Sequence, residues 1–226
     1  MRNKNKEDFN KLNCKKFRLA NQRNVYLVFC IFGALLVYLG ISIYNYWPDL
    51  DNIILKDISS TRSNFLTELS FVCSWAGNYF VAPVTIITAV ILGIKKKWHY
   101  LAEMALPVIL ATLSCTFIKT IVMRPRPITL GFDALVDEPL FSFPSGHTTG
   151  ASVMVLAFLI VLWQTSVKLT YKIICTTIGT IFALSVAWSR MYNAVHFPSD
   201  IIGSFGLVFF FSFVILYITE SCRTKN

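Results

Sequence analysis

Residues 25–44 read VYLVFCIFGALLVYLGISIY, a run without a single charged side chain. A helix needs about 20 predominantly apolar residues to cross a hydrocarbon core of about 30 Å. The run continues into Tyr-Asn-Tyr-Trp-Pro at 44–48 and lacks the small-residue cleavage site of a signal peptide. We therefore predict an uncleaved first membrane-spanning helix.

Further apolar stretches of similar length follow along the chain. Hydrophobic residues make up 55% of the 226 residues and charged residues 15%, against about 25% charged residues in a soluble domain. This composition excludes intrinsic disorder and argues against an ordinary cytosolic domain. We predict an all-α fold, an integral membrane bundle of six transmembrane helices, with the later spans near 70–94, 98–123, 145–163, 171–189 and 200–219. Gly77 and Asn78 weaken the second span, so we expect its first half to be tilted or interfacial.

The formal net charge of +9 has two interpretations. In a soluble protein it would suggest a nucleic-acid partner, whereas in a membrane protein it orients the spans. We favour orientation and expect no nucleic acid as a partner. If the N-terminus is cytoplasmic, the basic segment 1–24, Lys95–Lys97 and the segment 220–226 all fall on the cytoplasmic side. We therefore predict a basic tail at 1–24, a six-helix domain at 25–219 and a short tail at 220–226, with both termini cytoplasmic.

The six cysteines form no CxxC pair and show no metal-ligand spacing. Most lie within or beside apolar runs, where cysteine behaves as a small hydrophobic residue. We expect neither a disulfide framework nor a bound metal.

Polar and charged side chains gather at the predicted outer ends of the later spans. They are Lys119, Arg126-Pro127, Pro144-Ser145-Gly146-His147, Ser189-Arg190, His196 and Asp200. Arginine forks and a lysine can together hold one phosphoryl group, and the N-terminus of a helix starting at Ser145 favours an anion. Asp200, four residues after His196, can hold one ring nitrogen and leave the other to attack phosphorus. His147 can protonate the leaving oxygen and later activate water.

These residues resemble the three signature motifs of the type 2 phosphatidic acid phosphatase (PAP2) family. The motifs appear here as Lys119-x6-Arg126-Pro127, Pro144-Ser145-Gly146-His147 and Ser189-Arg190-x5-His196-x3-Asp200. The resemblance implies that His196 is the nucleophile that forms a phosphohistidine, that Asp200 orients it and that His147 is the general acid. It implies phosphate binding by Lys119, Arg126, Ser145, Gly146 and Arg190, without a metal or cofactor.

Arg124 precedes the first motif by two residues, and the six-residue gap selects Arg126 instead. We expect Arg124 to contact a headgroup or to serve as an interfacial anchor.

The leading hypothesis is a multi-pass lipid phosphatase of the cytoplasmic membrane, with its active site on the extracytoplasmic side and membrane lipids around it. Undecaprenyl diphosphate is the leading substrate, with phosphatidylglycerophosphate, phosphatidic acid and lipid A as alternatives. A non-catalytic protein that binds or flips lipids is a hypothesis of another class, and a vanadate-dependent haloperoxidase is a third. The sequence alone does not indicate the oligomeric state.

Overall fold

A computed structural model describes the backbone of residues 2–139 and 141–223, and the side chains of residues 22–139 and 141–222. Most of the basic side chains predicted to form the N-terminal tail, and residues 224–226 of the C-terminal tail, lie outside these described parts. Arg23 is described, and its Nη2 donates to the Tyr217 hydroxyl at 2.8 Å.

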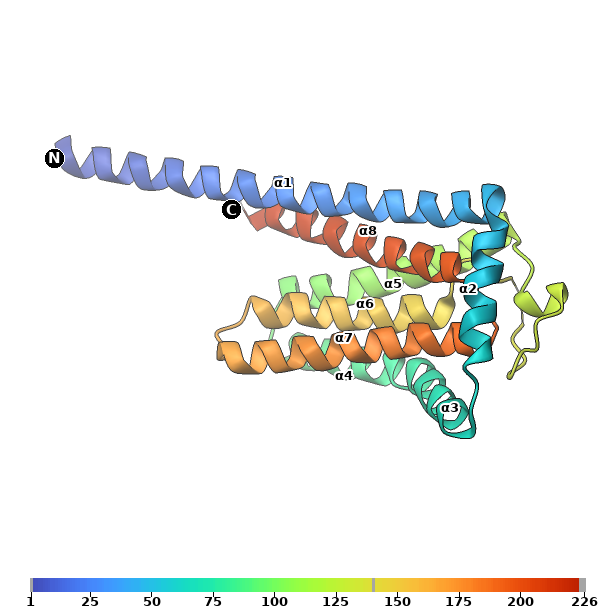
Figure 1. The fold of residues 1–226 in the computed structure, drawn as a ribbon. Coiled ribbons are helices and arrows are strands. Elements are labelled where there is room, and N and C mark those ends of the chain that lie inside the picture. Colours follow the sequence, from blue (N-terminus) through green and yellow to red (C-terminus); the bar gives the residue numbers. More distant parts are fainter. Residues whose placement is uncertain (1, 140, 224–226) are drawn as a thin grey trace.

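Within the described residues the fold is entirely helical (Figure 1). The elements are α1 (Arg2–Tyr46), α2 (Pro48–Ser60), α3 (Asn64–Tyr79), α4 (Val81–Ile94), α5 (Trp98–Val122), the 3-10 turn η1 (Pro127–Leu130), α6 (Gly146–Trp163), α7 (Leu169–Tyr192) and α8 (Pro198–Arg223). Among the described residues, six segments are long and apolar enough to cross a membrane. The predicted all-α membrane bundle of six spans is therefore confirmed.

The second span is not one continuous helix. It extends over Asn64–Ile94, and α3 and α4 meet at Phe80. Pro83 lies in the first turn of α4, where it lacks the N–H group that a continuous helix would bond to the carbonyl of Tyr79. Figure 1 shows α3 set at an angle to the parallel helices of the bundle, as expected for a tilted first half.

Helix α2 is a feature that the hydropathy pattern did not indicate. It begins with Pro48 in its first turn, together with Asp49 and Asp51. Proline is favoured at this position, and acidic side chains there are stabilised by the helix dipole. Helix α2 lies across one end of the bundle (Figure 1), and the site described below is at this end.

Helix α1 packs along α8. The two backbones approach closely at Gly33 and Gly206, because a Cβ atom on Gly33 would lie 2.5 Å from Phe210 N and one on Gly206 2.7 Å from Gly33 O. Only glycine avoids these clashes without moving a backbone. We call this contact the α1–α8 seam.

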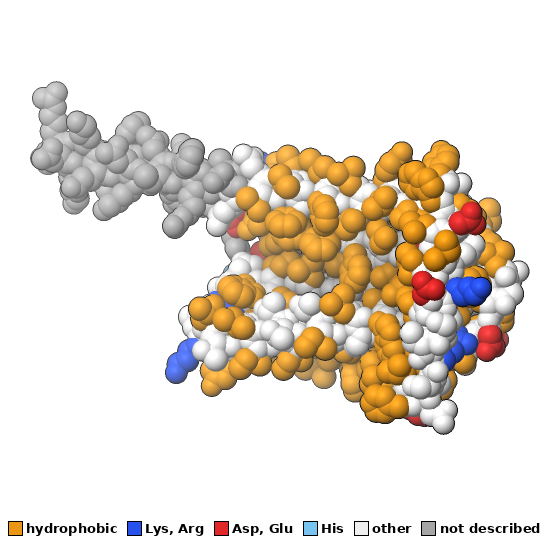
Figure 2. Space-filling model, in the orientation of Figure 1, with side chains coloured by type: hydrophobic (Ala, Val, Ile, Leu, Met, Phe, Trp, Pro, Cys, Tyr) orange, Lys and Arg blue, Asp and Glu red, His pale blue; other side chains and the backbone are white. Residues whose placement is uncertain are grey.

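The space-filling view shows apolar side chains along the sides of the bundle and charged side chains toward its ends (Figure 2). Exposed apolar residues on the lateral surface include Ile86, Leu113 and Ile178. An exposed apolar belt of this kind suits a lipid environment. The multi-pass membrane assignment therefore follows from both the length of the helices and their surface.

Candidate active site

The predicted site residues come from helix ends that meet beside α2. Lys119 is in the last turn of α5, and Arg190 is in the last turn of α7. Ser145 is the N-cap of α6, whereas Asp200 lies in the first turn of α8. Residues separated by up to about 80 positions in the sequence thus lie at one end of the bundle (Figure 1).

The path of the chain between these ends depends on local breaks. Met123 ends α5 with a left-handed φ of 46°, and Pro125 and Pro127 then prevent the helix from continuing. After α7, Ala194 adopts a φ of 52°, a conformation that is uncommon for a residue with a Cβ. This turn carries His196 back over the end of the bundle.

His196 is buried, with 1% of its surface exposed. Its Nδ1 lies 3.3 Å from Oδ2 of Asp200, and its Nε2 lies 3.3 Å from Nη1 of Arg126. Because a guanidinium can only donate, the arrangement fits the tautomer with a proton on Nδ1 and a lone pair on Nε2. Burial lowers the pKa of His196 to about 3, and the hydrogen bond to Asp200 offsets only part of this effect. The imidazole is therefore neutral and its Nε2 is available as a nucleophile.

Asp200 has its two oxygens in different surroundings. Oδ2 faces His196 and also accepts hydrogen bonds from Phe197 N, at 2.8 Å, and from the Ser142 hydroxyl. Oδ1 accepts from Nη1 of Arg124 at 2.7 Å. The carboxylate is thus held rigidly while one of its oxygens orients the imidazole.

Three cationic side chains surround the same space. Lys119 Nζ donates to the carbonyl of Phe141 at 2.7 Å, and Arg126 Nη2 donates to the carbonyl of Pro139 at 2.8 Å. Arg190 is fully buried and pairs with Glu138. Such a cluster of two guanidinium forks and one ammonium suits a phosphoryl group.

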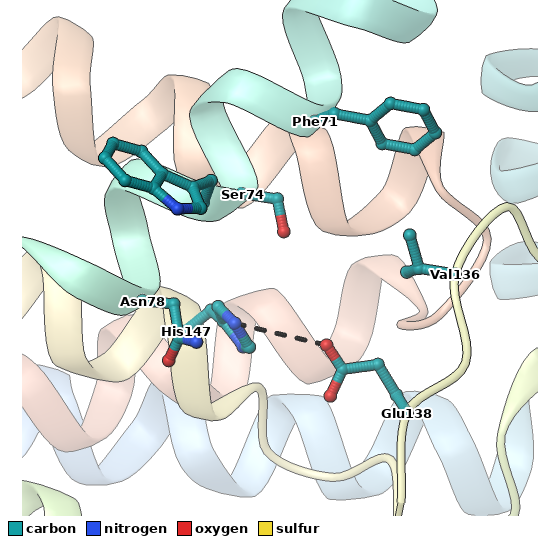
Figure 3. Close-up of a pocket in the computed structure, with 7 residues that line it drawn as sticks. Phe71, Ser74, Asn78, Val136, Glu138 and His147 are labelled. Atoms are coloured by element: carbon teal, nitrogen blue, oxygen red, sulfur yellow. Dashed lines mark ion pairs between the residues drawn. The ribbon is translucent and has the colours of Figure 1, made fainter.

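Glu138 lies among these cations. Its carboxylate pairs with Arg190, lies 3.9 Å from Arg126 Nη2 and 4.0 Å from His147 Nε2. Figure 3 shows His147 and Glu138 pointing toward one another. A carboxylate in this place offsets the repulsion between the neighbouring positive groups.

The start of α6 matches the predicted anion-binding helix terminus. The Ser145 hydroxyl accepts from Thr148 N at 3.4 Å, as an N-cap residue does. A Cβ added to Gly146 would meet no atom within 4 Å. The surrounding protein therefore does not require a glycine at this position, whereas a ligand that approaches the backbone would.

A cleft of about 380 Å³ adjoins His147 and Glu138. Phe71, Ser74, Trp75 and Asn78 line it from α3 (Figure 3). Trp75 is exposed on the outside of the bundle, so the cleft has an aromatic wall beside the charged groups.

The expectation for Arg124 is wrong. Its guanidinium is buried rather than interfacial, and pairs with both Asp51 and Asp200 at 2.7 Å. Two carboxylates compensate for the desolvation of this one cation. No headgroup can reach it without displacing them.

Sequence reasoning also missed four polar residues at this end of the bundle. Three of them contact predicted site residues, namely Glu138, Ser142 and Ser74. The fourth, Asp51, contacts Arg124 and Ser199 instead. Glu138 and Ser142 belong to a polar loop whose shape the sequence does not define. Ser74 is a single hydroxyl residue in an apolar helix. Asp51 is an ordinary acidic residue in the first turn of a helix. The doubled Arg-Pro at 124–127 was the only available signal that a second arginine belonged to this site.

The fold and site define a multi-pass membrane protein with a histidine and a cluster of cations at one end of its bundle. Residues 96–223 match the family model of the PAP2 superfamily. Phosphatidylglycerophosphatase B of Bacillus subtilis is 34% identical over 167 residues, which cover 71% of this chain and 80% of that protein. The chain therefore belongs to the PAP2 superfamily and is a membrane phosphatase of that family.

One further relative and two solved structures extend the comparison. The undecaprenyl-diphosphatase of Sulfolobus acidocaldarius is 26% identical over 163 residues, covering 69% of this chain and 71% of that protein. The crystal structure of the PAP2-type phosphatidylglycerolphosphate phosphatase of Bacillus subtilis superposes with a TM-score of 0.69 at 26% identity, covering 88% of this chain and 96% of that one. LpxE of Aquifex aeolicus shares the fold, with a TM-score of 0.54, 23% identity and coverage of 78% and 96%.

Proposed function

We propose that this protein hydrolyses the phosphate monoester or diphosphate of a membrane lipid through a phosphohistidine at His196. The observation that carries this proposal is the orientation of His196, whose Nδ1 faces Asp200 while Nε2 faces the cationic cluster. A neutral imidazole held in this tautomer is poised as a nucleophile.

The reaction has two steps. In the first, His196 Nε2 attacks phosphorus, the bond from phosphorus to the leaving oxygen breaks, and His147 donates a proton to that oxygen. In the second, His147 accepts a proton from water, the water oxygen attacks the phosphohistidine, and inorganic phosphate leaves. Lys119, Arg126, Arg190 and the backbone at Ser145 and Gly146 stabilise the charge on the transferred group.

A lipid substrate fits the surroundings of the site. The cleft beside His147 has aromatic side chains from α3 on one wall, and the lateral surface of the bundle is apolar. The acyl or isoprenoid chain would stay among the membrane lipids while the phosphate enters the cleft.

Two candidate substrates are supported by the names of relatives. Undecaprenyl diphosphate is the leading one from the sequence, and a relative named undecaprenyl-diphosphatase supports it. Phosphatidylglycerophosphate is supported equally by the more similar relative from Bacillus subtilis. Phosphatidic acid and lipid A remain candidates through the family motifs.

A lipid panel tests both the activity and the substrate. Purified protein is given undecaprenyl diphosphate, phosphatidylglycerophosphate, phosphatidic acid and lipid A separately, with His196→Ala as the matched control. We expect phosphate release from at least one lipid by the wild type and none by the variant. Comparable turnover of every lipid would exclude a dedicated enzyme, and the absence of release from all of them would favour a lipid-binding protein.

The proposed chemistry requires no metal. We expect activity to survive EDTA and to be inhibited by orthovanadate, which mimics the transition state of phosphoryl transfer. Complete loss in EDTA with recovery on adding Mg²⁺ would contradict this mechanism. Oxidation of bromide by the vanadate-treated protein would instead support the haloperoxidase hypothesis.

We further propose that the site faces the outside of the cytoplasmic membrane. Exposed Lys95–Lys97 follow α4, at the opposite end of the span from α2, and the positive-inside rule places such clusters in the cytoplasm. Cysteine replacements at Asp133 and Lys96 in a cysteine-free background test this orientation. In intact cells, a membrane-impermeant maleimide should label the cysteine at 133 and spare the one at 96, and the reverse pattern would overturn it.

A further inference from the structure

Asp51 and Arg124 form a buried charge cluster behind the catalytic pair. Arg124 Nη2 donates to Asp51 Oδ2 at 2.7 Å, and Arg124 Nη1 donates to Asp200 Oδ1 at the same distance. The Asp51 carboxylate also accepts from Ser199 N at 2.9 Å and from the Ser199 hydroxyl. Asp51 is 1% exposed, so the cluster is shielded from water.

The cluster connects helix α2 directly to the active site. Asp51 belongs to α2, which lies across the end of the bundle (Figure 1). Ser199 and Asp200 belong to the first turn of α8. Phe197 packs against the guanidinium of Arg124, with its ring centroid 4.0 Å from Cζ. Arg124 is therefore held on several sides in addition to its contact with Asp200.

The geometry divides the work of the Asp200 carboxylate. Arg124 occupies Oδ1, which leaves Oδ2 for His196 Nδ1. Rotation of the carboxylate would break its contact with Arg124. This contact therefore helps to keep Oδ2 directed at the Nδ1 of the imidazole.

The charges matter as well as the geometry. Arg124 alone would neutralise Asp200 and weaken its attraction for a histidine that becomes positively charged on phosphorylation. Asp51 supplies a second negative charge, so that two carboxylates face one guanidinium. The cluster then keeps a net negative charge beside His196, which favours the charged intermediate.

We propose that Asp51 and Arg124 are positioning residues that act through Asp200 on His196. This inference rests on the proposed function, because it assigns a task to residues behind the proposed nucleophile. Both side chains are buried, and neither is among the residues proposed to bind the phosphate. Their loss should therefore lower kcat and leave KM nearly unchanged.

The competing interpretation is a purely structural ion pair. Buried ion pairs are costly to desolvate and are often replaceable by apolar side chains without loss of stability. A structural role would appear as a lower melting temperature, with an unchanged kcat for the molecules that remain folded. The two interpretations thus differ in what is measured on the folded fraction.

The first test uses near-isosteric variants in the full-length protein. Asp51→Asn removes a charge but keeps the shape, and Arg124→Lys keeps the charge but loses the planar fork. We expect each to lower kcat by about 10- to 100-fold, as small misplacements of reacting groups do. The matched control is Asp133→Asn at the same end of the molecule, whose side chain is 89% exposed and pairs with Arg62. Its kcat should equal that of the wild type.

The second test asks whether Asp51 acts through Asp200. In an Asp200→Asn background the Asp51→Asn change should lower kcat by no more than about twofold, because residues that act as a unit are non-additive. Equal effects of Asp51→Asn in both backgrounds, or a wild-type kcat in the single variants, would overturn the inference. Failure of the proposed function would look different, since His196→Ala would then retain activity regardless of Asp51.

Discussion

Helix α8 is held in two different ways along its length. Its first turn carries Asp200 inside a buried network of charges, whereas its middle packs against α1 through Gly206 and Gly33. The seam is apolar and depends on the close approach of two backbones. The network is polar and carries a large desolvation cost, which a purely structural contact would not require. We infer that the seam supports stability and that the first turn supports chemistry.

The largest expected effect is at the chemical end. His196→Ala removes the nucleophile and should lower kcat by about 1,000-fold or more, as the loss of a catalytic nucleophile does. Thermal unfolding in detergent should show a folded protein. Phosphate release at the wild-type rate by this variant would show that the chemistry does not depend on His196.

A substitution in the α1–α8 seam should lower stability and leave kcat unchanged. Gly206→Ala places a Cβ 2.7 Å from both Gly33 O and Val37 N, and overpacking of this kind costs about 1–3 kcal/mol. We expect a lower melting temperature and an unchanged kcat per folded molecule. Gly93→Ala in α4 is the control, because its Cβ would meet nothing within 4 Å. Loss of kcat without loss of stability in Gly206→Ala would assign the seam to function.

The buried histidine should make the chemical end sensitive to acid. The pKa of His196 is lowered to about 3 in the folded protein, against about 6.5 in an unfolded chain. Between these values the unfolded state binds more protons, so stability falls as the pH falls, by up to about 1.4 kcal/mol per pH unit. Above about pH 6.5, His196 is deprotonated in both states and no longer makes the stability depend on pH. His196→Asn should flatten this dependence in melts recorded across the acidic range, and an unchanged slope would contradict it.

Gly146→Ala sharpens the contrast between the two kinds of glycine. Nothing in the protein opposes a methyl group there, so the melting temperature should stay the same or rise. We expect kcat/KM to fall by about 10-fold, because the methyl group would enter the space through which phosphate approaches the backbone. Full activity in this variant would remove the start of α6 from the phosphate site.

The smallest effect concerns Glu138. Its carboxylate competes with an anion for Arg190 and Arg126, so Glu138→Gln should lower the inhibition constant of orthovanadate several-fold. Asp133→Asn serves as the control for a lost charge on the same loop. Weaker inhibition in Glu138→Gln would mean that Glu138 positions the cations rather than competing for them.

Much of the fold followed from the sequence because hydropathy acts locally. Each predicted span overlaps a helix, except that the second is divided between α3 and α4. Ser145 caps α6 where its sequence context indicates a helix start. The break at Phe80 was weakly signalled by Gly77, Asn78 and Pro83. Helix α2 was missed because its 13 residues are too few to cross a membrane and include three aspartates.

The site divides along similar lines. Motif spacing placed His147, His196 and Asp200 at one end, where the structure also has them. Nothing in the sequence specifies that Arg124 points inward to Asp51, because that contact joins residues 73 positions apart. The position of Glu138 was equally unpredictable from the sequence, since the shape of its loop depends on the helices around it.

Trapping the phosphorylated intermediate would show directly whether His196 carries the phosphoryl group. The purified protein is mixed with a lipid substrate bearing a labelled terminal phosphate, quenched in alkali and digested for peptide mapping. We predict label on the peptide that contains His196, and none on the His196→Ala protein. Label on His147 or another side chain, or rapid turnover by His196→Ala, would show that His196 is not the nucleophile.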